Sequence, residues 1–158
     1  MTRVWVDETA LKHMTADAET HFPLETGGVL AGYVADNGDT VIRAVVGAGP
    51  GARHQRFRFE PDHAWQCERL DALYWESEGL VAYIGDWHTH PHGRPSMSWL
   101  DRRTLLKIAR HSDARCPSPL MIIGAGRPSA WDWDAHQYVG PGCLGLFAQA
   151  IRRSIHGF

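Results

Sequence analysis

Residues 80–101 read LVAYIGDWHTHPHGRPSMSWLD, an apolar run followed by alternating histidines, a polar loop and the start of a helical pattern. The run stays apolar at both alternating positions through Ile84, which is typical of a central strand covered on both faces. From Ser98 to about residue 112 the apolar residues recur at helical spacing. The stretch therefore predicts a buried strand that leads through a loop into a helix, with polar groups gathered between the two.

The patterns on either side predict a mixed domain around this strand. Helices are expected at residues 8–22 and 62–78, followed by Pro23 and Gly79 respectively. Strands are expected at residues 3–6, 26–34, 37–49, 56–60, 119–126, 131–139 and 143–147, with a hairpin turn at 36–39. The basic, mildly amphipathic tail at 147–158 could cover an edge or meet a second subunit, but a solvated C-terminal helix is the plainer expectation. The expected fold class is α/β of the α+β type, with two longer helices packed on a mixed, largely antiparallel sheet.

Length and composition indicate an ordinary globular protein. The chain has 158 residues, of which 44% are hydrophobic and 22% charged, and we expect one domain spanning residues 1–158. The formal net charge of -2 predicts no general attraction to nucleic acid or to an anionic membrane. The three cysteines lie far apart, which predicts neither disulfides nor a thiolate zinc site and suits a cytoplasmic location. No segment has the apolar length of a signal peptide or a membrane span, so neither export nor anchoring is expected.

The alternating histidines form a candidate metal site. Residues two apart in an extended chain point to the same side, so His88 and His90 can present two imidazoles to one point while Thr89 faces away. His90 and His92 form a second such pair, and the spacing does not choose between the pairs. In a chain with ten histidines, one H-x-H pair is a weak signal by itself.

Asp101 has two competing interpretations. It shares one stripe of the expected helix with Ser98, Leu105 and Ile108, so its carboxylate points inward and needs a charge or a metal as partner. Alternatively, Ser98 and Asp101 form a capping box, because S-x-x-D approximates that motif and an acid in the first turn suits the helix dipole. Taken alone, the pattern favours the cap.

Glu25, shortly before Gly27 and Gly28, gains interest only in combination with these groups, because a glutamate at a strand start is usually a solvated surface residue. Two neutral imidazoles and one carboxylate make a three-ligand zinc site, and a fourth position left to water is typical of catalytic zinc. A glutamate nearby can then move a proton from that water to a leaving amine, and a serine hydroxyl can donate to the oxyanion. Glu25 and Ser98 are the candidates for these two roles.

The combined pattern resembles the JAMM motif of the JAB/MPN-plus metallopeptidases. The matching positions are Glu25, His88-Thr89-His90-Pro91, the seven residues from Pro91 to Met97, and Ser98-x-x-Asp101. The resemblance covers roughly residues 8–139 and implies the cytidine-deaminase-like JAB/MPN fold. It also implies one zinc ion bound by His88, His90 and Asp101, with Glu25 as general base and acid and Ser98 stabilising the tetrahedral intermediate. His92 would then be a solvent-exposed residue in the mouth of the site, and Thr89 stands where many members have serine.

The resemblance further implies a protein substrate. Such enzymes typically cut amide or isopeptide bonds after the C-terminal glycines of ubiquitin or a ubiquitin-like protein. The Gly85–Pro91 stretch looks like that of bacterial members encoded in anti-phage conjugation operons. A non-catalytic binding scaffold with the same fold is the main alternative, and the same zinc chemistry on a sulfur-carrier precursor or a small amide is another.

Two further groups of residues are candidates for substrate contact. Gly27 and Gly28 could leave room for a Gly-Gly tail, although close strand packing explains them equally well. Trp99, Trp131 and Trp133 could form a surface for the body of the substrate, although a place in the core or at its rim is the plainer interpretation.

Overall fold

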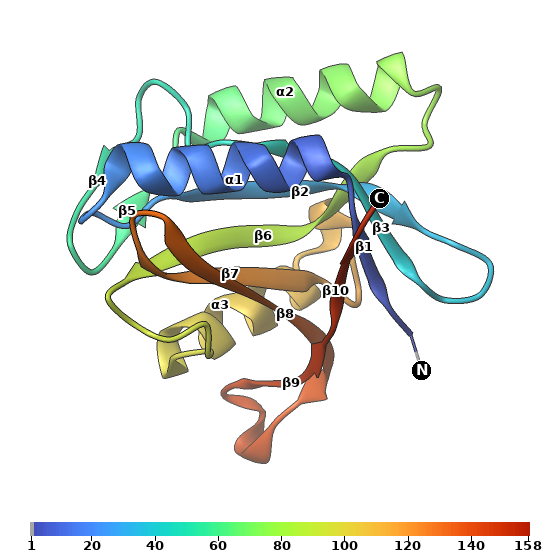
Figure 1. Ribbon diagram of the computed structural model, residues 1–158. Coiled ribbons are helices and arrows are strands. Elements are labelled where there is room, and N and C mark those ends of the chain that lie inside the picture. The colour runs from blue at the N-terminus through green and yellow to red at the C-terminus, as the bar shows by residue number, and fades with distance from the viewer. Residues whose placement is uncertain (1) are drawn as a thin grey trace.

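A computed structural model describes residues 2–158 and has the α+β architecture expected from the sequence (Figure 1). Its helices are α1 (Glu8–His21), α2 (His63–Glu76) and α3 (Trp99–Arg110), with short 3-10 turns at Ser112–Ala114 and Cys143–Gly145. Its strands are β1 (Val4–Val6), β2 (Gly27–Val34), β3 (Thr40–Val46), β4 (Arg53–His54), β5 (Phe59–Glu60), β6 (Ala82–Pro91), β7 (Leu120–Arg127), β8 (Ala130–Pro141), β9 (Ala148–Arg153) and β10 (Ile155–Gly157). The three helices lie where helical patterns were expected, at residues 8–22, 62–78 and after Ser98.

The large sheet is mixed and mostly antiparallel, as predicted. Its strand order is β10-β1-β3-β2-β6-β7-β8-β9. Strands β10, β1 and β3 run parallel to one another, as do β6 and β7, and the other neighbours are antiparallel. Helix α1 contacts β2 and β3, α2 contacts β2, β3 and β6, and α3 contacts β8 and β9. Strand β6, predicted as central, therefore lies in the middle of the sheet.

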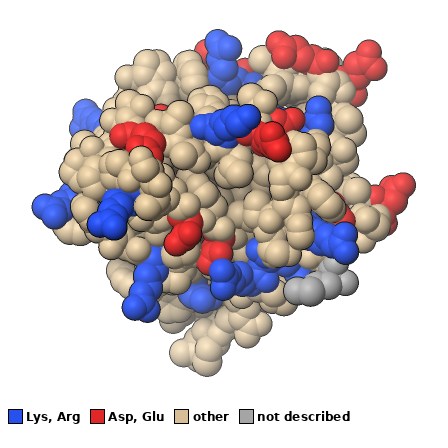
Figure 2. All heavy atoms as spheres, in the orientation of Figure 1, with Lys and Arg blue, Asp and Glu red and all other residues tan. Residues whose placement is uncertain are grey.

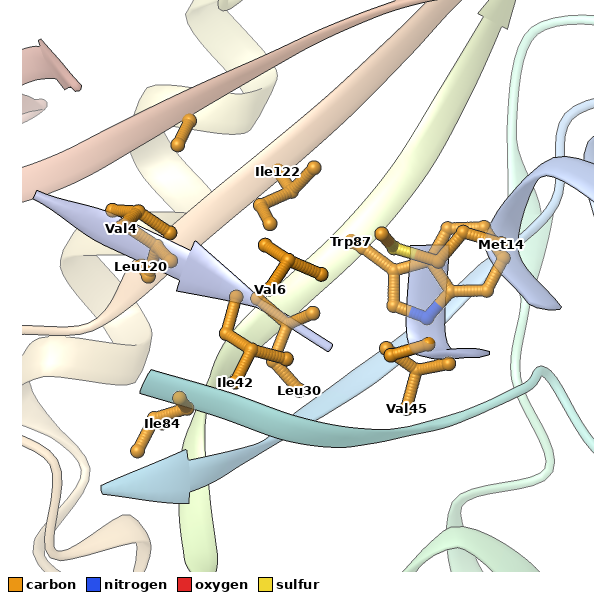
Figure 3. Packing of buried hydrophobic residues seen from close by; sticks show 12 residues of the cluster. Val4, Val6, Met14, Leu30, Ile42, Val45, Ile84, Trp87, Leu120 and Ile122 are labelled. Carbon is orange, nitrogen blue, oxygen red and sulfur yellow. The ribbon is translucent and has the colours of Figure 1, made fainter. Parts of the chain in front are cut away.

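Alternation along β7 divides the core into two clusters. Leu120 and Ile122 point into the main cluster, where Trp87 packs with Met14 of α1 and with apolar residues of β1, β2 and β3 (Figure 3). Met121 and Ile123 point to the opposite face and pack with the buried residues of α3. Because successive side chains of a strand point to opposite faces, one apolar strand attaches α3 to the rest of the domain.

The C-terminal segment is where the sequence-based prediction is wrong. It forms strands β9 and β10 instead of a solvated helix, and the strand expected at 143–147 is replaced by a 3-10 turn that precedes β9. Strand β9 pairs with β8 and β10 pairs with β1, at opposite ends of the sheet, with only Ser154 between them. The tail therefore closes the sheet on itself. Pairing with the edges of β1 and β8, which would otherwise leave backbone groups unpaired, stabilises the tail as strands more than its helical propensity stabilises a helix.

The strand expected at 56–60 is also shorter than predicted. Only Phe59 and Glu60 are extended, and they pair with Arg53 and His54 in a separate two-stranded ribbon, β4-β5. The connecting residues Arg56, Phe57 and Arg58 form an exposed tip, with Phe57 82% exposed.

The surface carries charges of both signs. Figure 2 shows acidic side chains gathered at the upper right of the view and basic ones along its lower part, with both signs mixed elsewhere. All three cysteines are free, which agrees with the prediction that they form no disulfides. Among residues 2–158, no helix has the length and apolar character to cross a membrane.

Candidate metal and catalytic site

The structure selects the first of the two histidine pairs. His88 and His90 lie at the C-terminal end of β6 and point to the same side, and their Nε2 atoms are 3.0 Å apart. His92 lies beyond the strand end with a positive φ of 60°, is exposed, and packs edge-on against Phe22. The prediction that His92 is an exposed loop residue is therefore confirmed.

Asp101 satisfies both of its competing interpretations at once. Its backbone N–H donates to Ser98 Oγ at 3.1 Å while its Oδ2 accepts from the Ser98 backbone N–H at 2.7 Å, which is a complete capping box. The same carboxylate places Oδ1 3.1 Å from His88 Nε2 and Oδ2 3.5 Å from His90 Nε2. The first turn of α3 lies opposite the C-terminal end of β6. The carboxylate that caps the helix therefore also points at the two imidazoles.

The donor atoms of His88, His90 and Asp101 fit a small divalent cation. They form the only group of three or more potential ligand residues found among residues 2–158. A tetrahedral ion with bonds of about 2.0–2.1 Å holds its ligand atoms about 3.3 Å apart. The two imidazole Nε2 atoms are 3.0 Å apart, and each has a carboxylate oxygen of Asp101 nearby, Oδ1 at 3.1 Å from His88 and Oδ2 at 3.5 Å from His90. The Nδ1 of His90 lies 3.1 Å from the carbonyl oxygen of Arg94, so Nδ1 carries the proton and Nε2 presents a lone pair to the site.

The protonation of these side chains also suits a cation. Burial, together with the neighbouring His88, lowers the pKa of His90 and keeps its imidazole neutral. Burial by itself would raise the pKa of Asp101, but the hydrogen bond from His88 and those from Ser98 outweigh it and hold that pKa well below its usual value. The site therefore offers a neutral imidazole and a charged carboxylate, the forms in which these side chains bind metal ions.

Glu25 lies two residues before β2 and is partly buried. It shares an open cleft of about 500 Å³ with His90 and the 91–98 loop, which includes Ser98. Burial raises the pKa of Glu25 to about 7, with His88 lowering it and Asp101 raising it to smaller extents. A carboxyl group with a pKa near neutrality can both accept and return a proton, as general acid–base catalysis requires.

A pair of threonines joins Glu25 to the histidine strand, and the sequence did not indicate it. Thr89, whose side chain faces away from the histidines, is fully buried. Its Oγ1 accepts the backbone N–H of Thr26 at 3.0 Å, and its own backbone N–H donates to the Thr26 carbonyl at 2.9 Å. Thr26 in turn donates its hydroxyl to Asp17 of α1 at 2.7 Å. Glu25 is therefore held beside the histidines through the residue that follows it.

Histidines also hold the loop between β6 and α3. His136 of β8 places Nε2 2.8 Å from the carbonyl oxygen of Pro95, and His90 Nδ1 bonds the Arg94 carbonyl. Nothing in the sequence marked His136 for this role, because it lies 41 positions from Pro95.

Gly27 and Gly28 do not line the cleft. A Cβ on Gly27 would lie 2.3 Å from the Trp87 carbonyl oxygen, and one on Gly28 would lie 1.8 Å from the Val46 carbonyl oxygen. The close-packing interpretation of the two glycines is therefore right.

The three tryptophans have separate environments. Trp133 packs against the main core, and Trp131 is half-buried and donates its Nε1–H to Glu19 at 3.0 Å. Trp99 directly follows Ser98 and is 65% exposed. Two of the three therefore belong to the core or its rim, and Trp99 alone stands at the surface beside the site.

Comparison of the sequence with known proteins shows the family of this chain. Residues 7–136 match the family model described as prokaryotic homologs of the JAB domain. A probable metalloprotease, y4qB, of Sinorhizobium fredii (strain NBRC 101917 / NGR234) is 39% identical over 140 residues, covering 87% of this chain and 83% of the relative. A protein of Enterobacter hormaechei subsp. hoffmannii (strain UCI 50) named CD-NTase/cGAS isopeptidase is 30% identical over 125 residues, covering 78% and 68%.

A solved structure shows the same fold at low sequence identity. The solution structure of protein DSY2949 from Desulfitobacterium hafniense superposes with a TM-score of 0.67 at 17% identity, covering 98% of this chain and 92% of that chain. At this identity the likeness concerns the fold alone.

Proposed function

This chain belongs to the prokaryotic homologs of the JAB domain and is a JAMM-type hydrolase, and we propose that it is a zinc isopeptidase acting on a ubiquitin-like protein. The bond to be hydrolysed is the amide that follows the C-terminal glycines of that protein, in a conjugate or in a precursor. The observation that carries the proposal is the convergence of His88, His90 and Asp101 within 3.5 Å of one another, beside a cleft that contains Glu25.

In this proposal His88, His90 and Asp101 hold the metal. Two imidazole nitrogens and one carboxylate oxygen suit zinc and leave room for a further ligand. When bound, the ion supplies Lewis acidity that polarises the scissile carbonyl and makes water nucleophilic near neutral pH.

Glu25 and Ser98 perform the remaining steps. The Glu25 carboxylate accepts a proton from the attacking water and returns it to the nitrogen of the leaving amine as the carbon–nitrogen bond breaks. The hydrogen bonds that hold Glu25 go to its main chain, and its carboxylate faces the cleft. Ser98 Oγ accepts the Asp101 N–H, and its hydroxyl, which also hydrogen-bonds the Asp101 carboxylate, can turn to donate to the carbonyl oxygen as negative charge develops there.

The proposed substrate class follows from the relatives and from the shape of the cleft. Relatives named isopeptidases point to a bond between a main-chain carboxyl and a side-chain amine. An extended Gly-Gly tail carries no side chains and suits a cleft bounded by the 91–98 loop and by the β4-β5 tip. Since the same relatives are named for CD-NTase/cGAS, we further propose that the substrate is a conjugate made in a bacterial anti-phage system.

The test is cleavage of a defined probe. A labelled extended peptide that ends in Gly-Gly is linked through an isopeptide bond to a lysine side chain, and an otherwise identical probe ends in Ala-Ala. We expect cleavage at the isopeptide bond of the Gly-Gly probe alone, lost on dialysis against chelator and restored by zinc. Glu25→Gln should abolish cleavage, whereas Glu68→Gln, on an exposed position of α2, should not change it. Zinc-loaded protein that cleaves neither probe would overturn the proposal and revive the scaffold alternative.

A further inference from the structure

The main chain of Glu25 is held on both sides by the β4-β5 ribbon. Its N–H donates to the carbonyl oxygen of Gln55 at 2.8 Å, and its carbonyl oxygen lies 3.0 Å from Nδ1 of His54. A carbonyl oxygen can only accept, so His54 Nδ1 carries the proton. The two hydrogen bonds to its main chain therefore set where the Glu25 carboxylate lies.

His54 is itself held by aromatic stacking. Its ring lies 3.8 Å from that of His21 at an interplanar angle of 21°, and Phe59 stacks on it with ring centroids 6.4 Å apart. His21 is anchored to α1, since its Nδ1 lies 3.0 Å from the carbonyl oxygen of Asp17. Phe59 lies against the β2 strand, where its ring occupies the space that a side chain at Gly27 would need. The imidazole of His54 is therefore fixed between α1 and β5 with its Nδ1–H directed at Glu25.

We infer that His54 is a positioning residue that places the Glu25 carboxylate for proton transfer. It bonds the main chain of Glu25 and does not line the cleft, so it acts through Glu25 rather than on substrate. The inference rests on the proposed function, because it takes Glu25 as the group that moves the proton. Displacement of a catalytic group by about 1 Å can cost about 100-fold in rate, so loss of one of two backbone bonds should lower kcat measurably.

Three substitutions separate the hydrogen bond from the stacking. His54→Phe keeps a ring between His21 and Phe59 but removes the donor. His54→Asn removes the ring but places an amide N–H where Nδ1 was, whereas His54→Gln places it where Nε2 was. On the Gly-Gly isopeptide probe we expect kcat to fall about tenfold in His54→Phe and His54→Gln, with KM within twofold. His54→Asn should retain at least half of the kcat of the wild type, and zinc content should stay at one ion per chain throughout.

A second measurement does not depend on turnover. Nitrogen-15 NMR of the imidazole should show the Nδ1-protonated tautomer for neutral His54 in metal-free protein. For the kinetic comparison of the His54 variants, His13→Phe is the matched control. His13 is exposed on α1, so this variant should leave kcat unchanged. An Nε2-protonated tautomer would overturn the inference.

Two kinetic outcomes would also overturn it. One is a kcat within twofold of wild type in His54→Phe, and the other is an equal loss in His54→Asn and His54→Phe, which would indicate a purely structural role. The proposed function fails separately, through full activity of Glu25→Gln in the same assay.

Discussion

The buried hydroxyl of Thr89 accepts the backbone N–H of Thr26 at 3.0 Å, so the strand that carries both histidines directly holds the residue after Glu25. Thr89→Val keeps the shape of the side chain and leaves that N–H buried without an acceptor. We expect a loss of about 1–3 kcal/mol in the free energy of unfolding, together with reduced activity. Thr89→Ser retains the hydroxyl and should keep most of the activity. Urea denaturation of both variants gives the comparison, and equal stability of Thr89→Val and wild type would contradict it.

Removal of a proposed metal ligand should abolish zinc binding without unfolding the chain. Zinc content after purification without chelator should fall from one ion per chain to near zero in His88→Ala, with affinity reduced at least about 100-fold. Asp101→Asn tests the carboxylate more cleanly than alanine, since its amide oxygen can still accept the Ser98 N–H of the cap. His92→Ala, in the exposed loop, is the control and should bind zinc normally; zinc loss there instead of in His88→Ala would show that the other histidine pair is used.

Ser98 combines helix capping with proposed catalysis, and two substitutions separate these roles. Ser98→Gly removes the hydroxyl, although glycine at an N-cap costs only a few tenths of a kcal/mol. We therefore expect a nearly unchanged midpoint of thermal unfolding but a fall of about 100-fold or more in kcat with little change in KM. Ser98→Thr keeps both the hydroxyl and the cap and should stay within tenfold of wild type. If Ser98→Gly retains full kcat, Ser98 does not stabilise the oxyanion.

Glu25 should destabilise the metal-free protein as the pH rises. Burial raises the pKa of its carboxyl to about 7 from 4.5, so between these values the folded chain binds more protons at this position than the unfolded chain. Folding stability contributed by this group therefore decreases as the pH rises through that window. Because glutamine does not ionise, Glu25→Gln should be more stable than wild type by on the order of 1 kcal/mol at pH 8, after allowance for partial exposure, and by less at pH 5.

The measurement is the urea midpoint of metal-free protein at the two pH values. Glu68→Gln on the exposed face of α2 should show no such difference. A gain in Glu25→Gln that is larger at pH 5 than at pH 8 has the wrong sign for a raised pKa and would count against it.

The closing strands should contribute to stability through specific side chains. Ile155 of β10 packs against the main core, whereas Ile151 of β9 is 46% exposed. Ile155→Ala should lower the free energy of unfolding by about 1–2 kcal/mol, less than a fully buried isoleucine because Ile155 is only partly buried. Ile151→Ala should stay within about 0.5 kcal/mol of wild type. Equal effects in urea denaturation would contradict the arrangement of the tail.

Local patterns predicted most of the elements correctly. The helices at 8–22 and 62–78 and the helix after Ser98 were recovered to within two residues at most of their ends, because capping residues and apolar periodicity act within one or two turns. The central position of β6 was predicted from its apolar run, because a strand that is apolar on both faces is covered on both sides. The predicted tail helix failed because the partners of β9 and β10 lie at the two ends of the sheet, far away in sequence.

The candidate site also has features that local sequence predicted and features that only the tertiary structure decided. His88, His90, Ser98 and Asp101 were candidates from local spacing, because the period of a strand and the first turn of a helix place side chains on one side over a few residues. Spacing left the histidine pair and the role of Asp101 open, and only the resemblance to the JAMM motif chose among these alternatives and gave Glu25 its role. The tertiary structure decided which histidine pair faces Asp101, that Asp101 caps α3 and meets both imidazoles, and that His54 and Thr26 hold Glu25. These depend on how α3 and the β4-β5 ribbon dock on the sheet, and docking is set by the packing of distant apolar residues, which no local pattern encodes.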